Sequence, residues 1–240
     1  KNNNRNWYLG KTRDPVEWMR WDDEIKMFNS AEDRFKKWII QNPNPKEDGF
    51  YGGINEKGVA FTSTYVHVSE LQISYIRKPY VRLILDAATA EEAVEIISSF
   101  KPEIGGNMFI ADAENCFGIE SIPGKIFIQT IESNAVKTNH YLNFEERNLE
   151  YDNDPQLEKW TKTRFERAEE LLINAQSEDD LIQILRDRKN AENGISICRT
   201  DNELDCFTHS AFIFNCADAK AMYCQGDLLK NDFEAYSFNL

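Results

Sequence analysis

The stretch that decides the fold is GFYGGINEKGVAFTSTYVHV, residues 49–68. Two apolar arms flank residues 55–58, where Asn55 suits the first turn position and Gly58 can supply the positive φ of a bulged tight turn. Apolar arms of this length on either side of a turn signal are typical of strands. The stretch therefore predicts a β-hairpin and, with it, an antiparallel sheet.

Downstream of this hairpin, helical and strand patterns fall in separate blocks. Thr89 and Glu92 have the spacing of a capping box, and apolar residues at helical spacing follow until Pro102, which predicts a helix over 90–100. Three strand-like runs separated by the turns DAEN and PGK predict a meander. The remaining predicted elements are a helical zone from about 156 to 188 and strands at 194–198, 210–216, 220–226 and 233–238.

Upstream of the hairpin the pattern is less regular. NWYLGKT (6–12) predicts a strand, preceded by turn-forming asparagines, and we interpret it as the second arm of a hairpin. From 14 to 48 we expect a loop-rich excursion with a strand at 24–28, a short amphipathic piece at 33–40 and a breaker cluster at 42–49. Because hairpins dominate and helices form their own blocks, we expect an α+β layered fold rather than alternating βαβ units.

Composition limits the possible functions. Forty-one acidic residues against 28 basic residues leave a net charge of −13, which disfavours nucleic acid and anionic membranes as partners. Apolar runs stay short of the roughly 18 residues of a membrane span, and KNNNRNWYLG lacks the apolar core of a signal peptide. With 240 residues, 41% of them hydrophobic, we expect a soluble single domain spanning 1–240.

The cysteines follow no metal or redox spacing. There are five of them, an odd number without a C-x-x-C pair, and most lie in apolar or alternating runs. We interpret them as buried reduced thiols, which fits a reducing, cytoplasmic compartment. These residues are Cys116, Cys198, Cys206, Cys216 and Cys224.

Common motifs for metals, nucleotides and serine nucleophiles are missing from the sequence. His67, His140 and His209 lie far apart, and none belongs to an H-E-x-x-H or Cys/His pattern. The sequence also lacks a phosphate-binding glycine loop and the G-x-S-x-G elbow of serine hydrolases. We therefore expect no metal ion and no cofactor.

Two polar clusters flank predicted strands. GKTRDP places Lys11 and Asp14 directly after the first strand, where they can point into a cleft or form an ordinary surface ion pair. GGINEKG at the hairpin turn can have a purely structural role.

Two further clusters lie near the second helical zone. VKTNHYL contains Asn139, whose amide can donate to a developing oxyanion or cap a turn. TKTRFERAEELL carries Arg164 and Arg167 one helical turn apart, an arrangement also typical of a solvated helix face.

Taken in order along the chain, these clusters resemble one enzyme group. GKTRD, GGINEKGVAFTSTY, the helix TAEEAVEII leading to MFIADAENCFGIE, KTNHYL and T-x-x-R-F follow the succession of the choloylglycine hydrolase group of N-terminal nucleophile (Ntn) hydrolases. That group includes penicillin V acylases, bile salt hydrolases and isopenicillin N acyltransferase-like linear amidases. TNHYL and the compact length bring the chain nearer to the acyltransferase-like branch. The resemblance covers most of the chain from Trp7 onward and implies a four-layer αββα sandwich with mainly antiparallel sheets.

The resemblance implies a cysteine nucleophile at a mature N-terminus. Its α-amino group takes the thiol proton, a nearly balanced transfer because the two pKa values are about 7.7–8.0 and 8.5. By the family pattern this cysteine precedes Lys11 by a strand and a turn, about half a dozen residues before Lys1. We therefore expect a first strand upstream of Lys1. A homologue that has lost catalysis is the alternative.

The resemblance also assigns roles to residues that are present. Asp14 matches the aspartate that holds the nucleophile's amine, and Lys11 stands where the family usually has arginine, so the charge is kept and the bidentate fork is lost. Asn139 matches the oxyanion-hole asparagine. Arg164 matches the arginine of an S-x-x-R-F pattern, whose first residue here is Thr161.

Tyr65 matches a position that family members fill with asparagine or tyrosine and use partly through the backbone N–H. The other interpretation of Tyr65 is an ordinary strand aromatic.

The function implied is cleavage of the C–N bond of a linear amide through an acyl-enzyme. Acyl transfer to an amine acceptor and a non-catalytic binding protein with the same fold are the alternatives. The expected partner is a small-molecule amide, and a homo-oligomer is possible. Trp18, Trp21 and Met27 are candidates for an apolar acyl pocket, although plain packing also explains them.

Overall fold

A computed structural model describes residues 6–14, 23–42, 50–66, 79–102, 105–144, 155–200 and 207–238. Its strands and helices are β1 (Tyr8–Arg13), β2 (Glu24–Phe28), β3 (Lys37–Gln41), β4 (Phe50–Asn55), β5 (Ala60–Tyr65), α1 (Pro79–Ile84), α2 (Ala90–Ser98), β6 (Gly106–Ala111), β7 (Cys116–Ile122), β8 (Lys125–Thr130), α3 (Pro155–Leu172), α4 (Glu178–Leu185), β9 (Ser210–Asn215), β10 (Lys220–Gln225) and β11 (Glu234–Tyr236).

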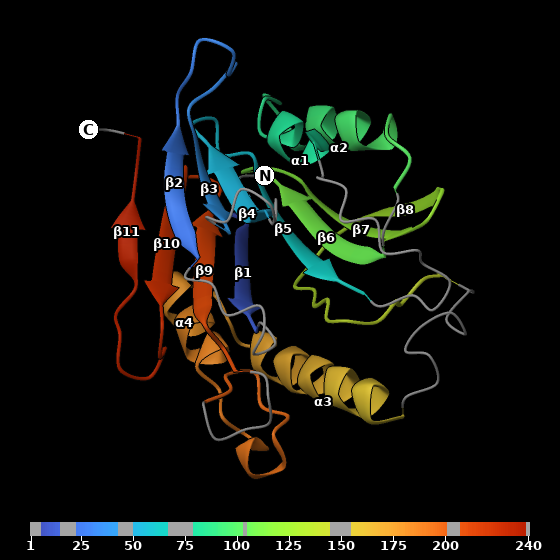
Figure 1. Ribbon diagram of the computed structural model, residues 1–240, viewed down its shortest axis with the longest axis vertical. Coiled ribbons are helices and arrows are strands. Elements are labelled where there is room, and N and C mark those ends of the chain that lie inside the picture. Colours follow the sequence, from blue (N-terminus) through green and yellow to red (C-terminus); the bar gives the residue numbers. More distant parts are fainter. Residues whose placement is uncertain are drawn as a thin grey trace.

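The strands form two antiparallel sheets. One has four strands in the order β1-β9-β10-β11, and the other has seven strands, β2 to β8, in chain order. The sheets face each other, with β1 against β5 and β10 against β4. Helix α2 covers β6 and β7, whereas α4 covers β1 and β9, so the two helical layers lie on opposite outer faces (Figure 1).

Three apolar cores hold these layers together. One lies between α1, α2 and the seven-stranded sheet, a second lies between the two sheets, and a third lies between α4 and the four-stranded sheet. Neighbouring residues of β5 show the division, since Phe61 belongs to the first core and Ala60 to the second. A strand covered on both faces has no solvent-facing side, which is why apolar residues of β5 near the turn pack on both faces of the sheet. The α+β fold with four layers, αββα, is confirmed.

The predicted hairpin is confirmed as β4 and β5. Gly58 has φ 84°, and a Cβ added there would lie 2.1 Å from the carbonyl oxygen of Cys216. Glycine is therefore required both by the backbone conformation and by the close approach of another chain segment. Asn55 completes the turn, because its Oδ1 accepts hydrogen bonds from the backbone N–H groups of Lys57 and Val59.

The expectation of a loop-rich excursion over 14–48 is wrong for its described part. The predicted strand β2 pairs with β3, and together they extend the seven-stranded sheet at one edge. The amphipathic piece at 33–40 is a strand from Lys37 onward. A buried lysine is unexpected from the sequence pattern alone. Lys37 is nevertheless fully buried, because the carboxylates of Asp33 and Asp86 supply opposite charges at 3.1 and 2.5 Å from its Nζ.

Two smaller expectations are corrected. The segment 194–198 is not a strand, although Ile195, Ile197 and Cys198 are buried, so its apolar pattern reflects packing without sheet pairing. The capping box before α2 is half formed: Thr89 accepts from the N–H of Glu92, while the Glu92 carboxylate accepts from Ala88.

The meander, the helical zone and the remaining C-terminal strands are confirmed as β6–β8, α3 with α4, and β9–β11. None of the helices in the described ranges is long and apolar enough to cross a bilayer.

Candidate active site

The candidate site begins where β1 and β5 come together across the two sheets. Leu9 of β1 packs in the core between the sheets, and Lys11, two residues on, points to the same side. The Lys11 ammonium donates to Thr64 Oγ1 of β5 at 3.1 Å and to the carbonyl of Thr12 at 3.0 Å. The apolar core thus gives way to polar side chains toward the last residues of both strands.

Asp14 directly follows β1 and is held by two segments distant in sequence. Its Oδ1 accepts a hydrogen bond from Thr208 Oγ1 at 2.8 Å, and Thr208 is 2% exposed. Its Oδ2 lies 3.9 Å from Nη1 of Arg164 on α3. Both side chains of this ion pair are largely buried, so water screens the interaction less than at a surface.

Arg164 joins Asp14 to Asn139. Its Nη2 donates to Asn139 Oδ1 at 2.9 Å, and its Nε donates to the carbonyl of Trp160 at 3.3 Å. Arg167, one turn further along α3, instead forms salt bridges with Asp187 and Glu170. The arginine pair noted in the sequence is therefore divided between the site and the packing of α3 against later segments.

Asn139 connects this group to the end of β5. Its Nδ2 donates to the carbonyl of Tyr65 at 2.8 Å, and its own backbone N–H donates to Thr161 Oγ1 at 2.8 Å. An arginine can only donate and a carbonyl can only accept, so these two partners fix which way the Asn139 amide points. The Tyr65 side chain is 49% exposed, and its backbone carbonyl takes part in the network.

The structure thus brings together all five residues that the resemblance placed at the catalytic site. Hydrogen bonds and an ion pair run from Asp14 through Arg164 and Asn139 to the Tyr65 carbonyl. Lys11 bonds to the neighbour of Tyr65. The residues come from β1, β5, a loop after β8 and helix α3, so only the folded chain assembles them.

A sequence comparison shows the family of this chain. The family model described as acyl-coenzyme A:6-aminopenicillanic acid acyl-transferase matches residues 1–229. The chain belongs to this family. No curated protein sequence matches the chain.

Solved structures share the fold of this acyltransferase-family chain. A variant of the conjugated bile acid hydrolase from Clostridium perfringens aligns with 98% of this chain and 94% of its own length, at 14% identity and a TM-score of 0.56. The N-acylethanolamine-hydrolyzing acid amidase ortholog of Caenorhabditis elegans aligns over 86% of both chains, at 12% identity and a TM-score of 0.53. These alignments show that the family member shares its fold with both neighbours.

The cysteines described in this family member are buried. Burial, together with the nearby charge of Asp112, raises the pKa of the Cys116 thiol to about 12. Burial also raises the pKa of Cys224, and that of Cys216 well above its usual range. Cys198 is 1% exposed, and Cys206 lies outside the described residues. Thiols with raised pKa values are poor nucleophiles, in line with their prediction as packing residues.

The proposed acyl-pocket residues are not assembled by the described structure. Trp18 and Trp21 lie outside the described residues. Met27 lies on β2, opposite Trp38, and strands β3 and β4 separate it from β5. Its role in substrate binding remains a prediction.

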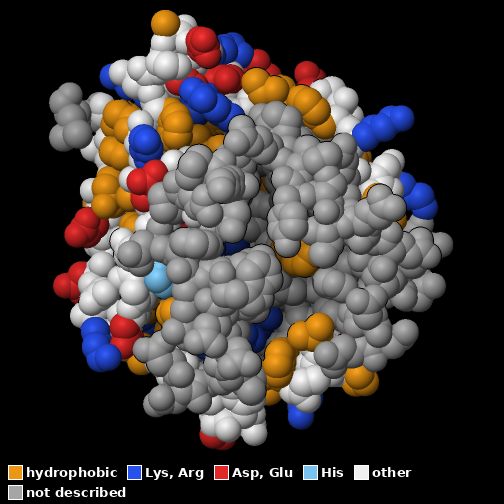
Figure 2. Space-filling view, viewed as in Figure 1, with side chains coloured by type: hydrophobic (Ala, Val, Ile, Leu, Met, Phe, Trp, Pro, Cys, Tyr) orange, Lys and Arg blue, Asp and Glu red, His pale blue; other side chains and the backbone are white. Residues whose placement is uncertain are grey.

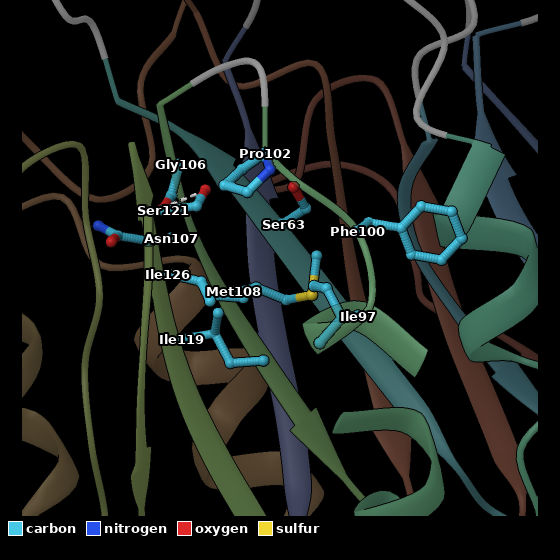
Figure 3. A pocket seen from close by; sticks show the side chains of 10 residues that line it. All are labelled: Ser63, Ile97, Phe100, Pro102, Gly106, Asn107, Met108, Ile119, Ser121 and Ile126. Carbon is cyan, nitrogen blue, oxygen red and sulfur yellow. Dashed lines mark hydrogen bonds between the residues drawn. The ribbon is translucent and has the colours of Figure 1, made fainter. Parts of the chain in front are cut away.

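A small hollow lies under the end of α2 (Figure 3). Its volume is about 20 Å³, room for about one water molecule, and its lining is mainly apolar apart from groups such as the hydroxyls of Ser63 and Ser121. A substrate does not fit there. Figure 2 shows acidic and basic side chains of described residues distributed around the edge of one face, with a few basic side chains visible nearer its middle.

Several residues that support the site gave little signal in the sequence. Thr208 holds Asp14, and Thr161 holds the backbone of Asn139. Glu120 looked like part of a core strand, yet its carboxylate binds the loop that carries Asn139. Thr161 could be noticed as the first residue of the T-x-x-R-F pattern. Among the described residues, no group of three or more His, Cys, Asp or Glu side chains could hold a metal ion.

Proposed function

We propose that this protein is a cysteine Ntn hydrolase that cleaves the C–N bond of a linear amide through an acyl-enzyme. The observation that carries the proposal is the network of Asp14, Arg164 and Asn139 beside the end of β5. The two structural neighbours named as a conjugated bile acid hydrolase and an N-acylethanolamine-hydrolyzing acid amidase support an amide substrate.

The proposed nucleophile is an N-terminal cysteine on a strand preceding Lys1. Within the described ranges β1 pairs on one side only, with β9, so its other edge can accept the first arm of the predicted hairpin. In an antiparallel hairpin the first residue of one arm lies opposite the last residue of the other. A cysteine at the start of that arm would therefore lie beside the end of β1, next to Asp14.

Each step of the proposed reaction uses groups at this position. The α-amine takes the thiol proton, and Asp14 accepts a hydrogen bond from the amine and orients it. The thiolate attacks the amide carbonyl, the ammonium returns its proton to the leaving nitrogen, and the C–N bond breaks. Water then attacks the resulting thioester and releases the acid.

Asn139 is the proposed donor to the oxyanion. A carboxamide carries two N–H hydrogens, one of which binds the Tyr65 carbonyl. The second is assigned to the oxyanion, where one such donor contributes about 10²–10³-fold in rate. Arg164, which donates to Asn139 Oδ1, polarises the amide and makes that donor stronger. Lys11 adds positive charge near the thiolate.

Acyl transfer to an amine is the second candidate function. The family model that matches residues 1–229 carries the description of an acyl-transferase. Chemically the two functions differ only in whether water or an amine attacks the acyl-enzyme.

The proposed setting of the enzyme follows the sequence predictions. We propose a single domain, a small amide substrate with an apolar acyl group bound in part by Trp18, Trp21 and Met27, and a cytoplasmic, homo-oligomeric enzyme.

The test is an assay of the native full-length protein together with N-terminal sequencing. We expect an N-terminal cysteine and release of free amine from a panel of N-acyl glycines and N-acylethanolamines, measured by mass spectrometry. Added acceptor amines would reveal acyl transfer as new amides. Asp14→Asn should abolish amine release, whereas Asp187→Asn, which removes a carboxylate paired with Arg167, should retain it. An N-terminus without cysteine and no released amine would favour a non-catalytic binding protein.

A further inference from the structure

One fully buried carboxylate binds both ends of the loop that carries Asn139. Glu120 lies on β7 and is 0% exposed. Its carboxylate accepts hydrogen bonds from one lysine side chain, one asparagine side chain and three backbone N–H groups. Oε1 accepts from Lys137 Nζ at 2.8 Å, from Leu142 N at 3.0 Å and from Asn143 Nδ2 at 3.0 Å. Oε2 accepts from the backbone N–H groups of Asn143 and Phe144 at 3.0 and 3.3 Å.

This arrangement closes residues 137–144 into a ring around a single anion. Lys137 opens the segment and the amides of 142–144 end it, so Asn139 lies between two attachment points. Asn107 of β6 fastens the residues on either side of Asn139, because its Nδ2 donates to the carbonyls of Thr138 and His140, each at 2.7 Å. The backbone of Asn139 is therefore restrained from two strands of the sheet.

Lys137 and Glu120 form a buried ion pair, and removing two charges from water costs free energy. Burial alone would raise the pKa of Glu120, but the hydrogen bond and charge of Lys137 and the backbone donors outweigh it and hold that pKa below its usual value. Burial lowers the pKa of Lys137, opposed by Glu120. A buried ion pair is often no more stabilising than apolar residues of similar size, and fixing one conformation is its better-attested use.

We propose that Glu120 and Lys137 are positioning residues that set the Asn139 amide against the reacting carbonyl. This inference rests on the proposed function, because the geometry matters only if Asn139 donates to an oxyanion. A donor displaced by about 1 Å can cost about 10²-fold in rate.

The chain offers a matched control. The Lys37 side chain is 0% exposed, compared with 5% for Lys137, and it forms ion pairs with Asp33 and Asp86. These pairs bind β3 and the segment before α2 rather than the Asn139 loop. Lys37→Met and Lys137→Met thus remove the same charge from two buried pairs. Only the second is expected to change catalysis.

The kinetic test is a double-mutant cycle on the native full-length enzyme. Glu120→Gln should lower kcat about 10²-fold with little change in KM, Lys137→Met should lower it in the same sense, and Lys37→Met should leave it within about twofold. In an Asn139→Ala background, Glu120→Gln should lower kcat by less than about twofold. The proposal would be overturned if Glu120→Gln lowered kcat as much in the Asn139→Ala background as in the wild type. It would also be overturned if Lys37→Met lowered kcat as much as Lys137→Met.

A second measurement separates this inference from the proposed function. Hydrogen exchange of the amides over 137–144 should be at least about tenfold faster in Glu120→Gln and Lys137→Met than in Lys37→Met. Lys137→Met leaves the other donors to Glu120 in place and serves as the test where Glu120→Gln does not fold. A wild type that releases no amine contradicts the proposed function alone. Unchanged exchange in both loop variants contradicts the positioning role, whatever the activity.

Discussion

The two ends of β5 show the same chemistry put to different uses. At the turn end, Asn55 is 0% exposed and donates to the carbonyls of Leu85 and Ala87 while its oxygen accepts from two backbone N–H groups. At the open end, Asn139 also donates to a backbone carbonyl, that of Tyr65, but its oxygen accepts from Arg164. An asparagine bonded to backbone alone fixes a turn, whereas one bonded to a charged side chain can pass that polarity to a substrate.

Buried lysine pairs near both ends extend the comparison. Lys37 lies opposite Asn55 in the β3–β4 register and pairs with Asp33 and Asp86, while Lys137 pairs with Glu120. A buried ion pair therefore does not by itself mark a site. Whether a buried pair contributes to catalysis or only to stability depends on which segment it holds in place.

The largest expected effect concerns the turn end. Gly58→Ala should lower the free energy of unfolding by about 2–5 kcal/mol, because its Cβ would meet the Cys216 carbonyl oxygen and its backbone is left-handed. Gly124→Ala is the control, with φ 76° and open space around the added Cβ, and should cost about 1–2 kcal/mol. Urea denaturation measures both. Equal losses would show that the close approach at Gly58 contributes nothing.

Substituting the two asparagines tests the comparison itself. Asn139→Ala should lower kcat about 10²–10³-fold with a small change in Tm, because it removes the proposed oxyanion donor. Asn55→Ala should retain kcat and lose about 1–3 kcal/mol of unfolding free energy, because buried backbone groups lose their partners. Steady-state kinetics and thermal melts on both variants give the answer. Full activity in Asn139→Ala would remove that residue from the site.

The two arginines of α3 sharpen the same distinction. Arg164→Met should lower kcat about 10–100-fold, the value of a hydrogen bond to a charged group, since it contacts both Asp14 and Asn139. Arg167→Met should lower Tm and leave kcat unchanged, because its partners are Asp187 and Glu170. A kcat loss in Arg167→Met as large as that in Arg164→Met would contradict the division.

Acid should weaken both ends through their buried carboxylates. The pKa of Glu120 lies below its ordinary value of 4.5 in the folded protein. Its contribution to stability is therefore complete above pH 4.5 and is lost as the pH falls through the folded pKa. Asp33 behaves likewise: burial would raise its pKa, but hydrogen bonds from Ser30, Lys37 and Arg82 lower it well below 3.8. Tm measured against pH should fall less steeply in acid for Glu120→Gln and Asp33→Asn than for wild type. An unchanged slope would show that these groups are not ionised in the fold.

The smallest effect is expected at Cys216, behind the hairpin turn. Cys216→Ala should cost about 1 kcal/mol of unfolding free energy and leave activity unchanged, because its thiol is buried and its pKa is raised well above its usual range. Activity assays and melts check this. A large activity loss would point to an internal nucleophile.

Local patterns predicted much of the fold. The β4–β5 hairpin, α2 and the meander were predictable because their turn and capping residues lie within a few positions of one another. Strand β3 was missed because the burial of Lys37 depends on carboxylates from outside the strand, Asp33 and also Asp86, which lies 49 positions away along the chain. The segment 194–198 has the apolar content of a strand, but no neighbouring strand pairs with it in the described structure.

The site was predictable only through the family resemblance. Asp14, Asn139 and Arg164 each look like ordinary turn, cap or surface residues, and their interaction exists only across sequence separations of 25 residues or more. Glu120 and Thr208 lay beyond that resemblance, because nothing local distinguishes a core glutamate that binds five donors from one in an ordinary strand.

The central claim is that an N-terminal cysteine beside Asp14 forms the acyl-enzyme. The most direct measurement is peptide mapping by mass spectrometry of the native protein quenched during turnover of an N-acyl substrate. The account predicts one acyl adduct, on a cysteine that precedes Lys1 and carries a free α-amine, and a much weaker adduct in Asn139→Ala. An adduct on Cys116, Cys198, Cys206, Cys216 or Cys224, or turnover with no adduct at an N-terminal cysteine, would contradict it.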